Sequence, residues 1–161
     1  MLRMLILVIC CGVFACGTNP EEQPSDPEQI LNDFETAWDN QDLAGLDACL
    51  SSDFFYELPS TEWYDYDGDG IIDTGFGEEL YLQFADGTFD SADSVSLTLY
   101  GDGHEAWPGD PTGESVIMPR QFHLDVFYPD STDESSGEWD FIVRPEGEGW
   151  IIWLMELRLD S

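Results

Sequence analysis

Lysine is absent from this sequence, and basic residues of any kind are scarce. The 161 residues contain four Lys and Arg together, all of them arginine, against 35 Asp and Glu, which gives a formal net charge of −31 at pH 7. Nucleic acid is excluded as a partner, because proteins bind it by neutralising phosphates with Lys and Arg. The same charge repels anionic lipid headgroups and favours surroundings rich in cations, such as a salt-rich habitat or a cation-rich cell surface.

Cysteine is also scarce, and its four positions do not form a framework of disulfides. Cys10 and Cys11 lie in an apolar leader, Cys16 follows that leader, and Cys49 is alone. A lone thiol of this kind is most simply a small buried hydrophobic side chain. The sequence shows no paired-cysteine metal pattern and no Ser-His-Asp or Cys-His arrangement typical of nucleophilic enzymes.

No apolar run is long enough to span a bilayer. Residues 1–15 are typical of an export signal, with Arg3 before a short apolar core at residues 4–9. The next motif, Val-Phe-Ala-Cys, resembles a bacterial lipobox, in which Phe14 is an unusual occupant. The resemblance implies that Cys16 becomes the lipidated N-terminus of the mature chain. The alternative is a soluble secreted protein that is cleaved nearby.

Residues 16–27 predict a flexible tether, because they are rich in polar residues and proline and carry no large apolar side chain. Residues 28–161 then form one domain of ordinary size. Lipid anchoring places this domain in the bacterial cell envelope. If Cys16 is lipidated, the resemblance to bacterial lipoproteins implies sorting to the outer membrane or the cell surface rather than the inner membrane, because Gly17 and not aspartate follows the cysteine.

The first half of the domain predicts a helical hairpin. Asp26 and Pro27 suit the N-cap and first turn of a helix. The apolar residues of this helix recur at helical spacing: Ile30, Leu31, Phe34, Ala37 and Trp38. Residues 40–42 then begin a shorter helix, which residues 51–53 end. Its apolar residues are Leu43, Leu46 and Leu50.

A third short helix is predicted over residues 78–85. Leu80 and Phe84 would lie on its buried side, and Asp86-Gly87 would end it.

Strands dominate the second half, after a first strand at residues 54–58. Strict alternation from Ser94 places Val95, Leu97 and Leu99 on one face. A long loop at residues 101–113 follows. Further strands are predicted at residues 115–118, 120–128, 138–143 and 150–159, with Pro119 at a bulge or an edge and an acidic loop at residues 129–137. Helices followed by strands predict an α+β fold, in which a helical hairpin and a third short helix pack in a curved antiparallel sheet.

This order resembles the nuclear transport factor 2-like superfamily, which includes SnoaL-like and ketosteroid-isomerase-like proteins. The segment ILNDFETAWDNQDLAGLDACLSSDFFYEL is similar to the superfamily's opening, and FIVRPEGEGWII is similar to its last two strands. The resemblance covers about residues 26–159 and implies a cone-shaped domain with an interior cavity. The superfamily's catalytic residues do not match positions here, so none is transferred.

An aspartate ladder lies between the first strand and the third helix, where the superfamily has no such feature. The pattern consists of Asp65, Asp67, Asp69, Gly70, Ile71 and Asp73. Alternate carboxylates on a tightly curled backbone converge on Ca²⁺, the glycine permits the turn, and the residue at the seventh place offers its carbonyl oxygen. Residues 65–73 therefore predict a structural calcium loop inserted into the domain, while a solvated acidic turn is the alternative.

The loop resembles the short calcium loops of dockerins and thrombospondin repeats more closely than an EF-hand. Phe76 stands at the twelfth place, where an EF-hand carries a bidentate glutamate. Glu78 or Glu79 would have to curl back to complete the site. Ile72, at the eighth place, is expected to turn away from the ion and anchor the loop in the core.

Two histidines are the remaining candidates for chemistry. His123 and Asp125 share one face of a predicted strand, which suits a base with an orienting carboxylate. The alternation of Phe122, Leu124 and Val126 instead predicts that both lie on a solvated face. His104 lies in the long loop and is expected to be a surface residue.

Together these features predict a lipid-anchored, non-catalytic binding or scaffold domain with a calcium-stiffened loop. The alternative is a small-molecule isomerase, cyclase or hydrolase that uses the cone cavity. A cavity with a buried acid or base of raised pKa would favour the enzyme. A cavity filled by Trp38, Trp63, Phe84 and Trp153 would favour the binding domain. The expected partners are the membrane, through the anchor, and a small molecule or envelope protein. The oligomeric state stays open, a dimer included.

Overall fold

The computed structural model of the protein describes residues 26–65 and 70–158. The helices and strands of this part follow in chain order: α1 (Glu28–Asp39), α2 (Leu43–Cys49), β1 (Leu50–Glu57), β2 (Gly75–Gly77), α3 (Glu78–Ser91), β3 (Ser94–Tyr100), β4 (Glu105–Ala106), β5 (Val116–Phe127), β6 (Thr132–Glu146) and β7 (Gly149–Arg158).

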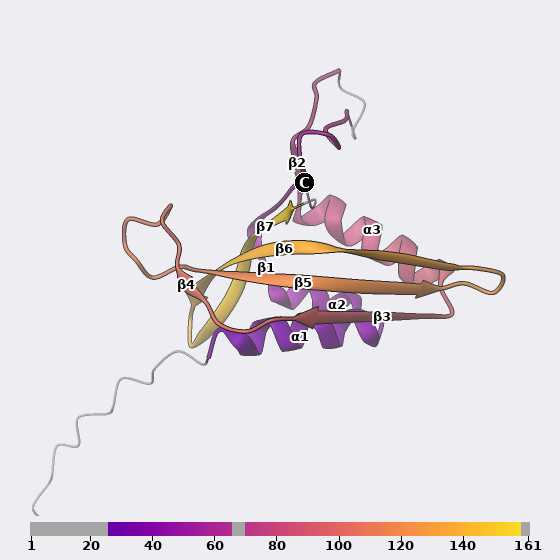
Figure 1. The fold of residues 1–161 in the computed structure, drawn as a ribbon, viewed down its shortest axis with the longest axis horizontal. Helices are drawn as coiled ribbons and strands as arrows, with labels where there is room; N and C mark the ends of the chain where they lie inside the picture. The colour runs from indigo at the N-terminus through magenta and orange to yellow at the C-terminus, as the bar shows by residue number, and fades with distance from the viewer. Residues whose placement is uncertain (1–25, 66–69, 159–161) are drawn as a thin grey trace, which may run out of the picture.

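The strands form one curved sheet, and the three helices pack on it (Figure 1). The sheet order is β2-β1-β7-β6-β5-β3, and β4 pairs with β5 beside this path. The α+β class and the curved sheet are confirmed, and the described strands pair in antiparallel fashion as predicted except for β1, which pairs with β7 in parallel. Parallel pairing joins strands at opposite ends of the chain, so the alternation within each strand does not reveal it.

The predicted apolar side of the first helix is buried in full. The Asp26 carboxylate accepts the Glu28 N–H at 3.1 Å, and the Asp42 carboxylate accepts the Gly45 N–H at 3.0 Å. These bonds satisfy N–H groups that have no partner within a helix. The predicted end of the second helix at residues 51–53 is wrong, because the chain passes from α2 into β1 at Leu50.

Two carboxylates of α1 cover the outer edge of the sheet. Asp39 accepts the Leu97 N–H at 2.7 Å, and Glu35 accepts the Leu99 N–H at 3.3 Å. Both amides belong to β3, which is the last strand of the sheet. An edge strand with free N–H groups invites pairing with another chain, so α1 both fills the core and protects this edge.

The third helix is longer than predicted, and a different side of it is buried. It continues to Ser91, and Tyr81 and Ala85 are its buried residues, whereas Phe84 is 50% exposed. Gly87 does not end it, because Phe89, one turn from Ala85, packs edge to face on Trp38 with ring centroids 5.2 Å apart. Tertiary packing therefore outweighs the weak helix propensity of glycine.

Pro119 lies inside one continuous strand, where two separate strands were predicted. On one side of β5, β3 pairs with residues 121–127 and β4 with residues 116–117, so Pro119 stands at the gap between them. Its carbonyl accepts the Arg120 guanidinium at 2.8 Å instead of a strand amide. The missing N–H of proline therefore costs no ladder hydrogen bond.

The predicted acidic loop at residues 129–137 is wrong for most of its length. Residues 132–137 are the first part of β6 and pair with β5, from Thr132 opposite Phe127 to Gly137 opposite Phe122. The turn between these strands comprises only residues 128–131.

An ion pair joins the start of α1 to the sheet. The Arg120 side chain is 2% exposed and its Nη2 lies 2.6 Å from Glu28 Oε2, whose side chain is 34% exposed. Arg120 Nη1 also donates to the carbonyl oxygens of Gly103 and Pro119. One guanidinium therefore links the helix, the loop after β3 and the middle of β5.

Candidate functional site

A small pocket lies between the helices and the sheet, and we call it the interior pocket. It has a volume of about 220 Å³ and is partly open to solvent beside the half-exposed Phe84. Its walls come from two helices and four strands: Trp38 of α1, Tyr56 of β1, Phe76 of β2, Tyr81, Phe84, Ala85 and Thr88 of α3, Leu124 of β5 and Trp139 of β6.

The walls of the interior pocket are mostly aromatic rings that hold one another in place. Tyr81 lies 5.8 Å from Tyr56 and 6.5 Å from Trp38, measured between ring centroids. Phe76 lies 5.1 Å from Tyr56 and 5.3 Å from Phe84. Rings at these separations attract one another beyond the area that they bury. The shape of the pocket is therefore built into the packed core.

The polar groups of the pocket are phenols and indoles. Trp139 Nε1 donates to the Tyr56 hydroxyl at 3.1 Å, and Thr88 Oγ1 donates to the Phe84 carbonyl. Burial, and then the neighbouring Tyr56, raises the pKa of Tyr81 above its ordinary value of 10. The buried Trp38 N–H, next to the Tyr81 hydroxyl, acts to lower this pKa, although the contact lacks normal hydrogen-bond geometry.

No Asp, Glu or His of the described residues lines the interior pocket. Tyr81 stays a neutral phenol at physiological pH, because its pKa is raised. The pocket can therefore donate hydrogen bonds to an uncharged molecule, but it holds no side chain of the usual type for removing a proton.

Two of the four residues expected to fill the cavity are elsewhere. Trp38 and Phe84 line the interior pocket as predicted. Trp63 is 45% exposed and donates to the Leu58 carbonyl at 2.9 Å. Trp153 packs against Trp107, with ring centroids 5.1 Å apart, in a different pocket. Tryptophan content alone could not distinguish these places.

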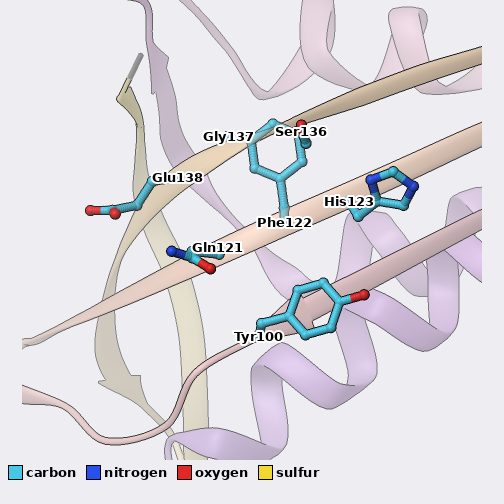
Figure 2. A pocket seen from close by; sticks show the side chains of 7 residues that line it. All are labelled: Tyr100, Gln121, Phe122, His123, Ser136, Gly137 and Glu138. Carbon is cyan, nitrogen blue, oxygen red and sulfur yellow. The ribbon is translucent and has the colours of Figure 1, made fainter. Parts of the chain in front are cut away.

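Figure 2 shows a second, polar pocket, which contains His123. It holds about 450 Å³ over β3, β5 and β6, and the Glu138 carboxylate points away from the His123 ring (Figure 2). His123 Nε2 lies 3.1 Å from Asp125 Oδ1, so the predicted pair is in contact, but the His123 side chain is 42% exposed. Among the described residues its one charged partner is Asp125, which supports the prediction of a solvated face. His104 is exposed, as expected.

The aspartate-rich loop is only partly within the described residues. Asp67 and Asp69 lie outside them. The Asp65 carboxylate accepts the Gly70 N–H at 2.9 Å, Gly70 has a φ of 88°, and Tyr64 and Asp73 form a bridge at the base. Such a turn fits the curled backbone of the pattern.

The flanks of the loop correct one expectation and bear on the choice between Glu78 and Glu79. Ile71 and Ile72 are both exposed, so the prediction that Ile72 anchors the loop in the core is wrong. The Glu78 carboxyl interacts with Asp47 of α2, and burial and this neighbour raise its pKa. Glu79, by contrast, lines one cavity together with Asp73. No group of three or more His, Cys, Asp or Glu that could hold a metal occurs within residues 26–65 and 70–158.

A buried carboxyl that the sequence did not reveal lies on β6. Asp140 has no exposed surface, and its ion-pair partner is Arg158. Burial raises the pKa of Asp140, and burial together with the facing Glu57 raises that of Glu156. Asp140 lies next to the inward-facing Trp139 and Phe141, so alternation directs it away from the interior pocket.

The leader and Cys16 lie outside the described residues. Within the described part of the chain, no helix has the length and apolar character needed to cross a membrane.

Comparison with known proteins identifies the fold. No protein-family model and no curated protein sequence matches the chain. A solved structure of a candidate scytalone dehydratase from Novosphingobium aromaticivorans is similar over 83% of this chain and 81% of its own, with 13% identity and a TM-score of 0.63. The β subunit of benzoate 1,2-dioxygenase from Burkholderia mallei is similar over 83% of this chain and 87% of its own, with 14% identity and a TM-score of 0.59.

A third neighbour carries the name of the fold itself. A nuclear transport factor 2-like superfamily protein from Salmonella enterica matches 83% of this chain and 87% of its own, with 13% identity and a TM-score of 0.56. The chain therefore has the nuclear transport factor 2-like fold, as the sequence resemblance implied.

Proposed function

We propose that the interior pocket binds a compact, uncharged, largely aromatic molecule and that this pocket is the functional centre of the protein. The observation that carries the proposal is the composition of its wall, in which aromatic rings surround hydroxyl and indole groups and no described carboxylate or imidazole takes part. A charged ligand would lose its hydration there without gaining an opposite charge.

The size of the pocket and the poorly satisfied Trp38 N–H narrow the choice of ligand further. About 220 Å³ is below the 300–1,000 Å³ typical of pockets for drug-sized ligands, so a single substituted ring is the right scale. The buried Trp38 N–H lacks a hydrogen bond of normal geometry, and a ligand oxygen beside it would satisfy this donor.

Binding of 4-ethylphenol and of its charged counterpart 4-ethylbenzoate, followed by NMR, tests the proposal. The phenol should bind and the benzoate should not. Thr88→Phe fills the pocket and should abolish binding, whereas Thr98→Phe, on β3 outside it, should leave binding unchanged. Failure of the phenol to bind, or equal binding by both substituted proteins, would refute the proposed site.

Catalysis in the same pocket is a second candidate, and the solved neighbours favour it. Two of the neighbours described above carry enzyme names, which agree better with an isomerase, cyclase or hydrolase than with a non-catalytic scaffold. Any such reaction would use Tyr56 and Tyr81 as hydrogen-bond donors or acids towards a substrate oxygen. Tyr81→Phe should then lose turnover of a neutral aromatic substrate and retain its binding. Equal turnover by wild type and Tyr81→Phe would exclude this role.

We also propose that the protein is lipidated on Cys16 and anchored in the bacterial cell envelope, in the outer membrane or at the cell surface rather than in the inner membrane. The proposal is supported by the leader and the lipobox-like motif alone. Mass spectrometry of the mature N-terminus tests it. An acylated Cys16 is expected in the wild type and an uncleaved precursor in Cys16→Ala, and an acyl-free mature N-terminus would contradict it.

Calcium binding by the aspartate-rich loop is a further proposal. The Asp65–Gly70 turn supports it, and the shared cavity of Asp73 and Glu79 favours Glu79 over Glu78 as the closing ligand. Thermal melting in calcium and in magnesium at matched ionic strength tests it. Calcium alone should raise the melting temperature, and only when Asp67 and Asp69 are intact. An equal rise in both salts would leave only general screening of negative charge.

A further inference from the structure

A separate pocket lies between the loop after β4 and the β6–β7 hairpin, and it shares no residue with the interior pocket. We call it the tryptophan corner. It holds about 330 Å³. The residues that matter for its chemistry are Trp107, Asp110, Glu114, Arg144 and Trp153.

The loop that carries Trp107 is held rigidly by its own hydrogen bonds. The Asp110 carboxylate accepts the Thr112 N–H at 2.8 Å, the Thr112 hydroxyl at 2.7 Å and the Ser115 N–H at 2.8 Å. The backbone N–H of Trp107 donates to the Ser115 carbonyl at 3.0 Å. A Cβ on Gly109 would come within 2.4 Å of the Trp107 ring, so glycine is what allows the indole to lie against the loop.

The indoles of Trp107 and Trp153 pack against each other at an angle, and an arginine lies over only one of the two. Their centroids are 5.1 Å apart and their planes 72° apart. The Arg144 guanidinium lies 5.6 Å from the Trp153 centroid, and Asp53 fixes it with two bonds of 2.6 and 3.1 Å. Cations within about 6 Å of an indole centroid are attracted by the ring. Trp153 is thus already paired with a cation, whereas no described cation lies over Trp107.

The charges around the corner favour a cation as ligand. Asp53 neutralises Arg144, and the carboxylates of Asp110 and Glu114 remain on the wall. The Asp110 carboxylate is committed to the loop, but the Glu114 carboxylate makes no hydrogen bond or ion pair with the described residues. The net charge of −31 adds attraction for cations and repulsion for anions.

We infer that the tryptophan corner binds a small quaternary or methylated ammonium compound, with its cationic head on the face of Trp107 and Glu114 as the counter-charge. Aromatic walls combined with a carboxylate suit such heads, because methylated nitrogen is weakly hydrated and spreads its charge over an apolar surface. Hydrated Na⁺ or Mg²⁺ would gain less from an indole face.

Choline and 3,3-dimethylbutan-1-ol form a matched pair of probes, because they share a shape and differ in the charge of the head. Titration calorimetry with the full-length protein should show choline binding at least tenfold more tightly than the neutral alcohol. Trp107→Leu should abolish choline binding, and Glu114→Gln should weaken it several-fold. Trp63→Leu, an exposed tryptophan elsewhere, serves as the matched control and should bind as the wild type does.

Four results would overturn the inference. Equal affinity for choline and the alcohol would show a merely apolar cavity. Choline binding that survives both Trp107→Leu and Glu114→Gln, or that is displaced by an equal concentration of NaCl, would show nonspecific counterion binding. Absence of choline binding at millimolar concentration would also exclude the site. Because Glu114 is exposed, its substitution tests the inference even if Trp107→Leu fails to fold.

Discussion

The two partners of the ion pair between Glu28 and Arg120 differ in burial, so replacing one should destabilise the fold more than replacing the other. Arg120 is buried, keeps its charge at all accessible pH values and has no other described carboxylate within ion-pair distance. Glu28 is one-third exposed, so it can turn towards water when its partner is removed. The same contact should therefore give two different costs, depending on which partner is changed.

The magnitudes follow from these two environments. Removing one partner of a fully buried ion pair costs about 3–5 kcal/mol, and we reduce this to about 2 kcal/mol for Glu28→Gln, because the amide oxygen still accepts one bond. Arg120→Met should cost only about 1 kcal/mol. The methionine keeps the packing of the arginine stem, and the partly exposed Glu28 and the exposed Gly103 and Pro119 carbonyls regain water. The double substitution should cost no more than Arg120→Met alone.

Urea unfolding of the four proteins, followed by tryptophan fluorescence at pH 7, measures these differences. Helical content before unfolding, from circular dichroism, controls for damage to α1. If Arg120→Met is more destabilising than Glu28→Gln, or if the two costs add in the double variant, burial of the guanidinium does not dominate the energetics and the reasoning is wrong.

Three further predictions concern buried polar groups. Tyr56→Phe should destabilise the fold by about 1–3 kcal/mol in urea unfolding, because the buried Trp139 N–H loses its acceptor; a neutral effect would contradict this. Burial, together with the negative charges of Asp33 and Asp42, raises the pKa of Cys49 to about 12. Iodoacetamide at pH 8 should therefore label this thiol far more slowly in the native protein than in the unfolded protein. Equal labelling rates would disprove the prediction. The pKa of Asp140 is raised in the folded state, so its contribution to stability is present at low pH and is lost as the pH rises through that pKa. The free energy of unfolding of Asp140→Asn should therefore increase relative to that of the wild type between pH 4 and pH 7. A difference that stays constant with pH would refute this.

The sequence predicts well those helices and strands in which the spacing of apolar residues alone indicates the type of element and its buried side. All five apolar positions predicted for α1 are buried, and β3 alternates as expected, because one side of each faces the core. Residues 132–137 carry no such pattern, since every side chain there is polar or absent. They form a strand because β5 offers them a ladder of backbone partners, which is a property of the neighbour and not of the segment.

The interior pocket was less predictable, although its existence follows from the fold. Tyr56 and Tyr81 belong to different elements, and neither lies in a motif that distinguishes it from the other aromatic residues. The sequence indicated Leu80 and Phe84 as the buried side of the third helix, and a rotation of about one residue separates that side from Tyr81 and Ala85. Both Tyr81 and Phe84 line the pocket, but the small error in the helix face assigned the buried position of Tyr81 to the half-exposed Phe84.

The placement of carboxylates explains why an acidic chain can keep an uncharged interior. Asp39 and Glu35 point to amides of the sheet edge, Glu28 to a guanidinium, and Asp140 to the other side of β6 from Trp139. Each of these carboxylates meets a backbone donor or an arginine, so none has to find a partner inside the cone. The amino-acid composition does not distinguish these acidic residues from one another. The fold places two of them at the sheet edge, one at the contact between α1 and β5, and one on the side of the sheet that faces away from the interior pocket. An aromatic, neutral pocket in a protein of net charge −31 is therefore a consequence of where α1 and β6 direct their side chains, and it is this pocket, more than the charge, that restricts what the interior can bind.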